Sequence, residues 1–295
     1  MKNTITILAP AKINIFLDVL GKRDDGFHDI SSVMQSIGIF DRLCVTANDA
    51  TQGESVIKVS CGDDALSDEK NIVYAAARAF FLAANIDSYN VSFDIEKRIP
   101  MMAGLGGGSA DAAAALSALN ALYKTELGVD KLAQIGASVG SDVPFCVKRG
   151  TVSVGGRGEI MKDAPPMPDC FVVVAMPNEE KMSTKEAYSR IDAVSADAPV
   201  SDIENALSAC DIERIGKSLF NKFEYILPSE SKSLALKKAF LDIGAHGALL
   251  CGSGSAVFGL FSSVAEAKAA AEKLSSEAET FVCTPIRRNT SLIEE

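Results

Sequence analysis

The stretch PMMAGLGGGSADAAAA, residues 100–115, decides the fold of this chain. Five of the seven residues from Gly104 to Ala110 are Gly or Ser, and an alanine-rich segment that favours a helix follows directly. Glycines let backbone N–H groups approach an anion closely, and a helix N-terminus adds free N–H groups and the positive end of the helix dipole. The stretch therefore predicts a phosphate cradle. The alternative is an ordinary Gly-rich turn, capped by Ser109 with Asp111 in the first helical turn.

The spacing of these residues excludes two common nucleotide-binding motifs. The pattern GxxxxGK[ST] needs a lysine that this stretch lacks, and GxGxxG counted from Gly104 meets Ser109 where its last glycine should stand. The order of elements also lacks the βαβ alternation of a dinucleotide-binding sheet. These observations exclude a dinucleotide-binding oxidoreductase.

Length and charge restrict the partners of the chain. Its 295 residues suffice for one large domain or two ordinary ones, and 47% hydrophobic residues are typical of a globular protein. A formal net charge of −10 argues against nucleic acid or an anionic membrane as the main partner. A local basic site for a phosphorylated small molecule remains compatible with this charge.

Cysteine and histidine usage points to a cytoplasmic protein without a histidine-rich metal site. The seven cysteines show no CxxC spacing and are expected to be reduced thiols. Lys12 and Asn14 interrupt the first apolar run, so no signal peptide is expected, and no apolar stretch is long enough to span a membrane. With only two histidines, a multi-histidine metal site is excluded.

Hydrophobic patterns predict a β-rich first half. Apolar and polar residues alternate within residues 5–20, which indicates a half-buried strand, and a turn at 21–26 leads to a second strand reaching about residue 40. Further strands at 41–47 and 55–61 would complete a β-meander. We expect a helix over 68–85 capped by Asp68, a strand over 89–99, a helix from the glycine loop to about 122, and a short helix over 129–140.

A proline-rich break at residues 162–170 predicts a second lobe, which gives an α+β chain with domains 1–161 and 162–295. The elements expected in this lobe are a strand over 171–177, helices over about 183–192, 201–220 and 231–243, a hairpin or bent strand over 247–261, a helix over 264–278 and a last strand over 280–288.

Polar residues on apolar strands are the first candidates for chemistry. Lys12 and Asn14 share one strand face, which suggests a pocket wall, although an isolated lysine usually extends to the surface. Phe27 and His28 follow a turn and could stack on and hydrogen-bond to a planar base, or be a core phenylalanine and a solvated histidine.

Two short segments are candidates for catalysis and phosphate binding. Asp142 in VGSDVPFC could be a general base or a common turn aspartate. The turn Gly252–Ser255 could be a tight hairpin, or a backbone surface that lies against phosphate or substrate.

Taken together, the motifs resemble those of the GHMP kinase superfamily. They are AKINIFLDVLGKRDDGFHDISSVMQSI (11–37), PMMAGLGGGSADAAAAL (100–116) and CGSGSAVFGLF (251–261), in the order of that superfamily. The segments AKIN (11–14), GKRDDGFH (21–28) and GSDVPFC (140–146) are similar to the branch that acts on 4-diphosphocytidyl-2-C-methyl-D-erythritol. The resemblance covers nearly the whole chain.

The resemblance implies a fold and an activity. The fold would have two lobes, an N-terminal β-rich lobe with helices and a C-terminal ferredoxin-like lobe, with the active site between them. The activity would be ATP-dependent phosphorylation of the acceptor's 2-hydroxyl group in non-mevalonate isoprenoid biosynthesis. ATP as co-substrate, Mg²⁺ and a cytidine diphosphate-linked small molecule would be the ligands of a monomer or weak homodimer.

The resemblance also assigns roles to residues. The catalytic pair would be Lys12 and Asp142. The sequence reveals no clear protein ligand for Mg²⁺, and Ser109 is no more than a candidate. Cytidine and erythritol would contact Asn14, Phe27 and His28, and Thr184 and Tyr188 would form the second half of a cytosine sandwich. The ATP-binding residues would be Pro100, Met101, Met102, Ala103, Gly104, Leu105, Gly106, Gly107, Gly108, Ser109 and Ala110, with Asn71 and Lys97 near the adenine.

Three positions need comment against the superfamily pattern. Phe27 replaces a usual tyrosine, which keeps the stacking face and removes a hydroxyl group. Asp18 stands at a variable position and supports no inference, and His246 is expected to be structural.

The expected mechanism is positioning and charge stabilisation. Asp142 would take the proton of the attacking hydroxyl, and Lys12 would stabilise the negative charge on Asp142 and on the developing alkoxide. Two alternatives are a kinase of another small alcohol, such as homoserine or mevalonate, and a catalytically silent nucleotide-binding regulator. The Phe27–His28 pair and Tyr188 argue against the first, and the retention of Lys12 and Asp142 argues against the second.

Overall fold

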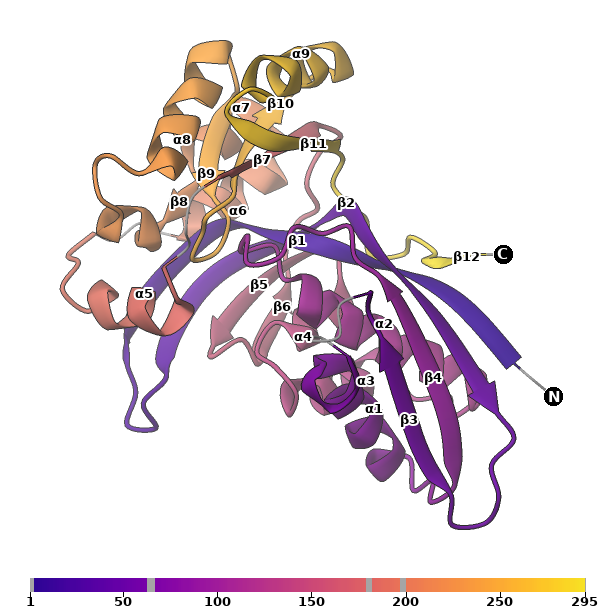
Figure 1. Ribbon diagram of the computed structural model, residues 1–295. Coiled ribbons are helices and arrows are strands. Elements are labelled where there is room, and N and C mark those ends of the chain that lie inside the picture. Colours follow the sequence, from indigo (N-terminus) through magenta and orange to yellow (C-terminus); the bar gives the residue numbers. More distant parts are fainter. Residues whose placement is uncertain (1–2, 63–66, 179–181, 197–199, 295) are drawn as a thin grey trace.

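A long antiparallel ribbon of two strands connects the two lobes of the molecule. The computed structural model describes residues 3–62, 67–178, 182–196 and 200–294. The ribbon consists of β1 (Asn3–Lys22) and β2 (His28–Asn48), and in Figure 1 it crosses the molecule between the N-terminal lobe and the C-terminal lobe. Strand β1 is part of the first sheet and also passes between the two lobes. Side chains in the central part of β1 therefore reach the space between the lobes.

The first sheet has the order β12-β1-β2-β4-β3, and β5, β6 and β8 join it at other edges. The strands besides the ribbon are β3 (Ser55–Ser60), β4 (Tyr89–Glu96), β5 (Thr151–Gly156), β6 (Ile160–Asp163), β8 (Phe220–Asn221) and β12 (Ile293–Glu294).

The expected meander is wrong in two respects. The strands expected to end at about 40 and to start at 41 are one strand, because the β1–β2 ladder continues past an irregularity in which Pro10 pairs with Phe40 and Ala11 with Ile37. In addition, β3 pairs parallel with β4, with α1 between them in the chain.

Helices cover one side of the first sheet in Figure 1: α1 (Ile72–Ala83), α2 (Gly107–Leu122), α3 (Val129–Ala137) and α4 (Val143–Lys148). The buried face of α2 is mostly alanine, which allows close packing against α1 and β1. The expected cap Asp68 is wrong. A 3₁₀ turn, η2 (Asp68–Lys70), precedes α1, and the side chain of Asn71 accepts the N–H of Val73 at 2.9 Å.

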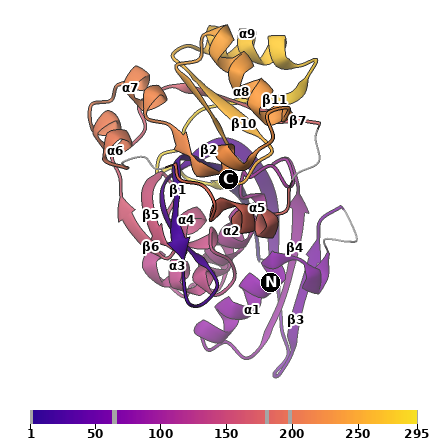
Figure 2. The ribbon, with the colours of Figure 1, turned by 90° about the vertical axis from the view of Figure 1, so that its left-hand side faces the viewer.

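The second lobe is built on the sheet β11-β7-β10-β9, and its place above the ribbon can be followed in Figures 1 and 2. The hairpin expected over 247–261 is confirmed by the antiparallel pairing of β9 and β10. The strands are β7 (Phe171–Pro177), β9 (Gly247–Leu250), β10 (Val257–Phe261) and β11 (Ala278–Cys283), and the helices are α5 (Thr184–Ile191), α6 (Val200–Ser208), α7 (Ile212–Lys217), α8 (Lys232–Ile243) and α9 (Val264–Leu274), with the 3₁₀ turn η3 (Lys222–Ile226).

The single helix expected over 201–220 is wrong, because α6 and α7 replace it. The chain breaks at Cys210, whose φ of 51° is left-handed, and Asp211 then starts α7 by accepting the N–H of Arg214 at 3.1 Å.

The two lobes share strands. The expected boundary between residues 161 and 162 falls inside β6, and the later part of the chain returns twice to β1. Phe16 pairs with Phe220 of β8, and Thr6 pairs with Glu294 of β12. These pairings tie the second lobe to the first sheet on both sides of Lys12. No helix in the described ranges is long and apolar enough to cross a membrane.

Candidate active site

Lys12 is buried at one end of a row of hydrogen-bonded polar side chains from β1 and β2. Its side chain donates to Asn14 Oδ1 at 2.8 Å, Asn14 Nδ2 donates to Ser32 Oγ at 2.9 Å, and Ser32 donates to the carbonyl of Phe16 at 2.7 Å. Lys12 is 5% exposed, so the alternative of a lysine reaching to the surface is wrong. The row fixes the ammonium group in one place, since Asn14 and Ser32 each have a second partner.

Asp142 completes this arrangement from the other side of the site. Its Oδ2 lies 3.4 Å from Lys12 Nζ. It immediately precedes α4 but makes no capping hydrogen bond with its side chain, and a third of that side chain is exposed. The side chain of Asp142 therefore does not serve as a helix cap. Its carboxylate can contact both Lys12 and a bound molecule.

The glycine loop packs directly on Lys12. The N–H of Lys12 donates to the carbonyl of Leu105 at 2.9 Å. Gly106 has a φ of 70°, and a Cβ atom there would lie 2.9 Å from Lys12 Cγ. Two independent reasons thus require glycine at this position: the left-handed backbone conformation and the lack of space for a Cβ atom.

Helix α2 begins at Gly107 with Gly106 as its N-cap, so the alternative in which Ser109 caps the helix is wrong. No side chain caps the first turn, and its N–H groups are left for another acceptor. An anion is the acceptor that the helix dipole favours there.

The second small-residue turn lies against the glycine loop. A Cβ atom on Gly104 would lie 1.9 Å from the carbonyl oxygen of Cys251, and the N–H of Ala256 donates to the carbonyl of Ala103 at 3.2 Å. A Cβ atom on Gly252 would lie 3.4 Å from Lys12 Nζ. The turn is therefore both a hairpin connection and a backbone surface against the loop and the lysine.

Tyr188 of α5 lies at the end of the site opposite the glycine loop. The ring of Tyr188 lies 5.0 Å from that of His28 and 5.0 Å from that of Phe223. Burial, and then the charge of Asp142, raises the pKa of Tyr188 to about 12. His28 Nε2 is 2.9 Å from Asp192 Oδ1, which fixes the imidazole between the two lobes.

Phe27 is 53% exposed, and its ring faces the guanidinium group of Arg157 at 4.8 Å. In this structure the ring against Tyr188 is therefore that of His28. The expected sandwich of Phe27 and Tyr188 stays a prediction.

One cavity of about 1010 Å³ joins these groups. Ala110 is buried in α2 and does not line it, and the side chain of Thr184 lies outside the described part of the structure. The other predicted site residues all line the cavity: Lys12, Asn14, Phe27, His28, Asn71, Lys97, Pro100, Met101, Met102, Ala103, Gly104, Leu105, Gly106, Gly107, Gly108, Ser109, Asp142 and Tyr188.

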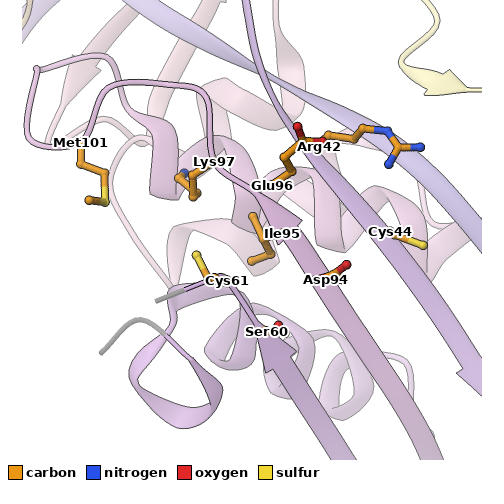
Figure 3. A pocket seen from close by; sticks show the side chains of 10 residues that line it. Arg42, Cys44, Ser60, Cys61, Asp94, Ile95, Glu96, Lys97 and Met101 are labelled. Atoms are coloured by element: carbon orange, nitrogen blue, oxygen red, sulfur yellow. The ribbon is translucent and has the colours of Figure 1, made fainter. Parts of the chain in front are cut away.

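A smaller cavity of about 640 Å³ opens on the strands β2, β3 and β4 (Figure 3). Lys97 and Met101 line both cavities, so this space adjoins the end of the site that lies away from Tyr188.

Several residues at the site were missed by sequence reasoning. Asp192 and Arg157, which contact His28 and Phe27, come from distant segments and lack a local signal.

Asp18, which supported no inference, is buried with Oδ1 3.2 Å from Lys222 Nζ. His246 bonds to Ser262 at 2.6 Å and does not line the cavity, which agrees with a structural role.

Lys97 is held by two carboxylates. Its Nζ contacts Asp41 Oδ2 and lies 2.6 Å from Asp111 Oδ2. Burial, opposed by the charge of Lys97 and reinforced by that of Asp41, raises the pKa of Asp111 to about 8. Among the described residues, no group of three or more His, Cys, Asp and Glu side chains could hold a metal ion.

Two family matches cover more than half of the chain. Residues 71–150 match the GHMP kinases N terminal domain, and residues 205–280 match the GHMP kinases C terminal domain. The chain belongs to the GHMP kinases. The expected fold and the expected ATP-dependent kinase activity are thereby confirmed.

Three of the proteins similar to this GHMP kinase are kinases of one compound. The 4-diphosphocytidyl-2-C-methyl-D-erythritol kinase of Exiguobacterium sibiricum is 41% identical over 87% of this chain and 89% of the relative. The enzyme of the same name from Desulfitobacterium hafniense is 40% identical over 88% of each chain. The crystal structure of a 4-(cytidine 5'-diphospho)-2C-methyl-D-erythritol kinase matches with a TM-score of 0.78 and 30% identity, over 97% of this chain and 99% of the other.

Proposed function

We propose that this GHMP kinase transfers the γ-phosphoryl group of ATP to the 2-hydroxyl group of 4-diphosphocytidyl-2-C-methyl-D-erythritol, in non-mevalonate isoprenoid precursor biosynthesis. The observation that carries the proposal is the position of the Lys12–Asp142 pair in one cavity, between the glycine loop and the pocket of His28 and Tyr188. The relatives' names support the same acceptor.

ATP is proposed to bind at the glycine loop. Residues 100–110 are proposed to contact ATP, and the N–H groups at the start of α2, from Gly107 to Ser109, would donate to the phosphate oxygens. Asn71 and Lys97 border the end of the cavity away from Tyr188, where we place the adenine.

The residues at the start of α2 fit Mg²⁺ as part of the nucleotide. Mg²⁺ at phosphate sites takes few protein ligands because phosphate oxygens and water supply the others. The hydroxyl group of Ser109 lines the cavity and is the proposed protein ligand. Bound Mg²⁺ would neutralise charge on the phosphate oxygens.

Asp142 is the proposed general base. Its carboxylate accepts the proton of the acceptor hydroxyl while the oxygen of that hydroxyl forms a bond to the γ-phosphorus and the bond to ADP breaks. Lys12, fixed by Asn14, stabilises the negative charge on the attacking oxygen and on Asp142.

The acceptor's cytosine is proposed to bind at the opposite end of the cavity. Phe27 and Tyr188 would supply stacking faces, and His28, fixed by Asp192, would read the base edge. Thr184, at the start of α5, and Asn14 would complete the acceptor contacts. The aromatic side chains at this end of the cavity would bind a nucleobase, which homoserine and mevalonate lack.

We propose the domains 1–161 and 162–295 for a cytoplasmic protein that is a monomer or weak homodimer. The seven cysteines are free thiols, which agrees with a reducing compartment.

A coupled ADP-release assay over a panel of alcohols tests the proposed function. The panel contains the cytidine-linked and uridine-linked methylerythritol diphosphates, uncapped methylerythritol phosphate, homoserine and mevalonate. We expect the highest kcat/KM for the cytidine-linked compound. Equal use of the cytidine-linked and uncapped compounds would contradict the proposed acceptor, and ADP release only with homoserine or mevalonate would replace it.

A further inference from the structure

A buried ion pair joins β1 of the first lobe to η3 of the second. Asp18 and Lys222 are both buried, and Lys222 Nζ lies 3.2 Å from Asp18 Oδ1. The same ammonium donates to the carbonyl of Val19 at 2.8 Å. Neither member of the pair lines the cavity, although their chain neighbours Leu17 and Phe223 do. The mechanism proposed above uses neither charge.

The parallel pairing of β1 with β8 brings the two charges together. Phe16 lies opposite Phe220, and Leu17 lies opposite Asn221, so the next residues in this register are Asp18 and Lys222. Asp18 Oδ1 has no hydrogen-bond partner within the described residues, and the ammonium of Lys222 compensates its charge. Removing that ammonium would leave the carboxylate buried without compensation.

On the side of the first lobe, the pair holds the base of the hairpin that carries Phe27 and His28. Asp18 and Val19 belong to the last part of β1. Val19 pairs with Ile30 across the ribbon, two residues beyond His28. The contacts of Lys222 therefore fix the end of the ribbon from which the hairpin tip projects.

On the side of the second lobe, the pair holds the residue that supports Tyr188. Phe223 follows Lys222 directly, and its ring packs edge-to-face on that of Tyr188 with 5.0 Å between the centroids. Asn221 ties this turn to β9, since its Nδ2 donates to the carbonyl of Leu250 at 2.9 Å and its Oδ1 accepts the N–H of Phe223 at 3.0 Å. The position of Lys222 is therefore set by the second lobe.

We propose that the Asp18–Lys222 pair sets the separation between the two walls of the acceptor end of the cavity. One wall is the hairpin tip with Phe27 and His28, and the other is Tyr188 on α5. Both members of the pair are positioning residues, because they act through their neighbours. The proposal deepens the proposed function and rests on it only for an acceptor that binds between these walls.

A buried ion pair suits this purpose better than apolar side chains. It contributes little to the free energy of unfolding, because desolvation cancels most of the attraction between the charges. Its geometry is nevertheless restricted, since one ammonium must reach both the carboxylate of Asp18 and the carbonyl of Val19. Apolar side chains of similar volume tolerate small shifts, so they would keep the lobes packed without fixing the distance between the walls.

The test compares the KM of the acceptor with the KM of ATP in Lys222→Met. This variant leaves the carboxylate of Asp18 uncompensated. We expect the acceptor KM to rise on the order of tenfold, as when part of a stacking contact is lost. The KM of ATP should stay within about twofold of wild type, because ATP binds at the other end of the cavity.

The double variant Asp18→Leu/Lys222→Met separates positioning from stability. It removes both buried charges and replaces them with apolar packing, which is often neutral or stabilising. We expect its thermal unfolding midpoint to return to near the wild-type value while its acceptor KM stays raised. A merely structural role would restore the midpoint and the acceptor KM together.

Lys237→Met is the matched control. Lys237 Nζ lies 2.5 Å from Glu224 Oε2, so this variant removes an ion pair from the same 3₁₀ turn, but one that lies within the second lobe. Both KM values should stay within about twofold of wild type.

Three outcomes would overturn the proposal. One is an unchanged acceptor KM in a folded Lys222→Met. Another is a wild-type acceptor KM in the double variant, which decides the matter even if Lys222→Met does not fold. The last is an equal rise of the acceptor KM and the ATP KM. Each variant is assayed with the panel compound that the wild type uses best. The wild-type ranking thus tests the proposed function, and the comparison of variants tests the pair.

Discussion

The two ends of the catalytic cavity are built differently. At the nucleotide end, the groups that face the cavity are mostly backbone, and buried side chains from β1, β2 and α2 hold that backbone in place. At the acceptor end, the cavity is lined by side chains on a turn and on α5, and Phe27 is more than half exposed. A backbone site suits phosphate, which every nucleoside triphosphate shares, whereas side chains can distinguish one base from another.

The largest effect is expected where the backbone end is broken. Gly106→Val should abolish ATP binding, because a branched side chain cannot adopt the φ of 70° and would meet Lys12 Cγ at 2.9 Å. Calorimetry with ATP measures the loss, and thermal unfolding confirms that the variant is folded.

Gly128→Ala is the matched control for this variant and should leave ATP affinity unchanged. The φ of Gly128 is −68°, a Cβ atom there would meet no atom within 4 Å, and Gly128 does not line the cavity. A folded Gly106→Val with wild-type ATP affinity would show that the loop has another purpose.

The next largest effect is expected at the junction of the two ends. Asp142→Asn should keep the binding of ATP and acceptor and lower kcat by about 10²–10⁴-fold, the usual cost of removing a general base. Single-turnover kinetics and calorimetry separate the two quantities. Near wild-type turnover in the folded variant would remove Asp142 from the mechanism.

A smaller and selective effect is expected at the side-chain end. Phe27→Ala and Tyr188→Ala should each raise the KM of the acceptor, by a stacking contribution of roughly 1–3 kcal/mol, and leave the KM of ATP nearly unchanged. Steady-state kinetics with each substrate varied in turn measure this difference.

Leu82→Ala, at an exposed apolar side chain on α1, serves as the control and should change neither KM. Should both aromatic variants raise the two KM values equally, the division of the cavity into two ends would not hold.

The smallest effect is expected for Tyr188→Phe. Burial raises the pKa of Tyr188 to about 12, so its phenol stays neutral to about pH 11 and contributes the ring face without a charge. We expect the acceptor KM to stay within about twofold of wild type, with the same pH profile up to pH 9.5. A large rise in KM would instead assign a hydrogen bond from the hydroxyl group to the acceptor.

The sequence predicted the residues whose signals are local. The glycine loop, Lys12 with Asn14, and the hairpin of residues 247–261 each stand in one short segment whose pattern has few explanations. The long helix expected over 201–220 fails because nothing in the side-chain pattern reveals the left-handed backbone at Cys210.

Other features could not be predicted because they depend on the fold. Asp41 and Lys97 are 56 positions apart, and each resembles an ordinary surface charge until the sheet and α2 bury them together. Arg157 and Asp192 likewise reach Phe27 and His28 from segments that only tertiary packing brings close.

The pairing of β1 with β12 has a consequence for synthesis on the ribosome. The edge of β1 at Thr6 receives its partner Glu294 almost three hundred residues later in translation. Until then its backbone donors and acceptors are open to other chains, as on any unprotected strand edge. The edge of β1 at Thr6 is thus protected only once residues 293–294 have paired with it, so this edge is protected late in folding.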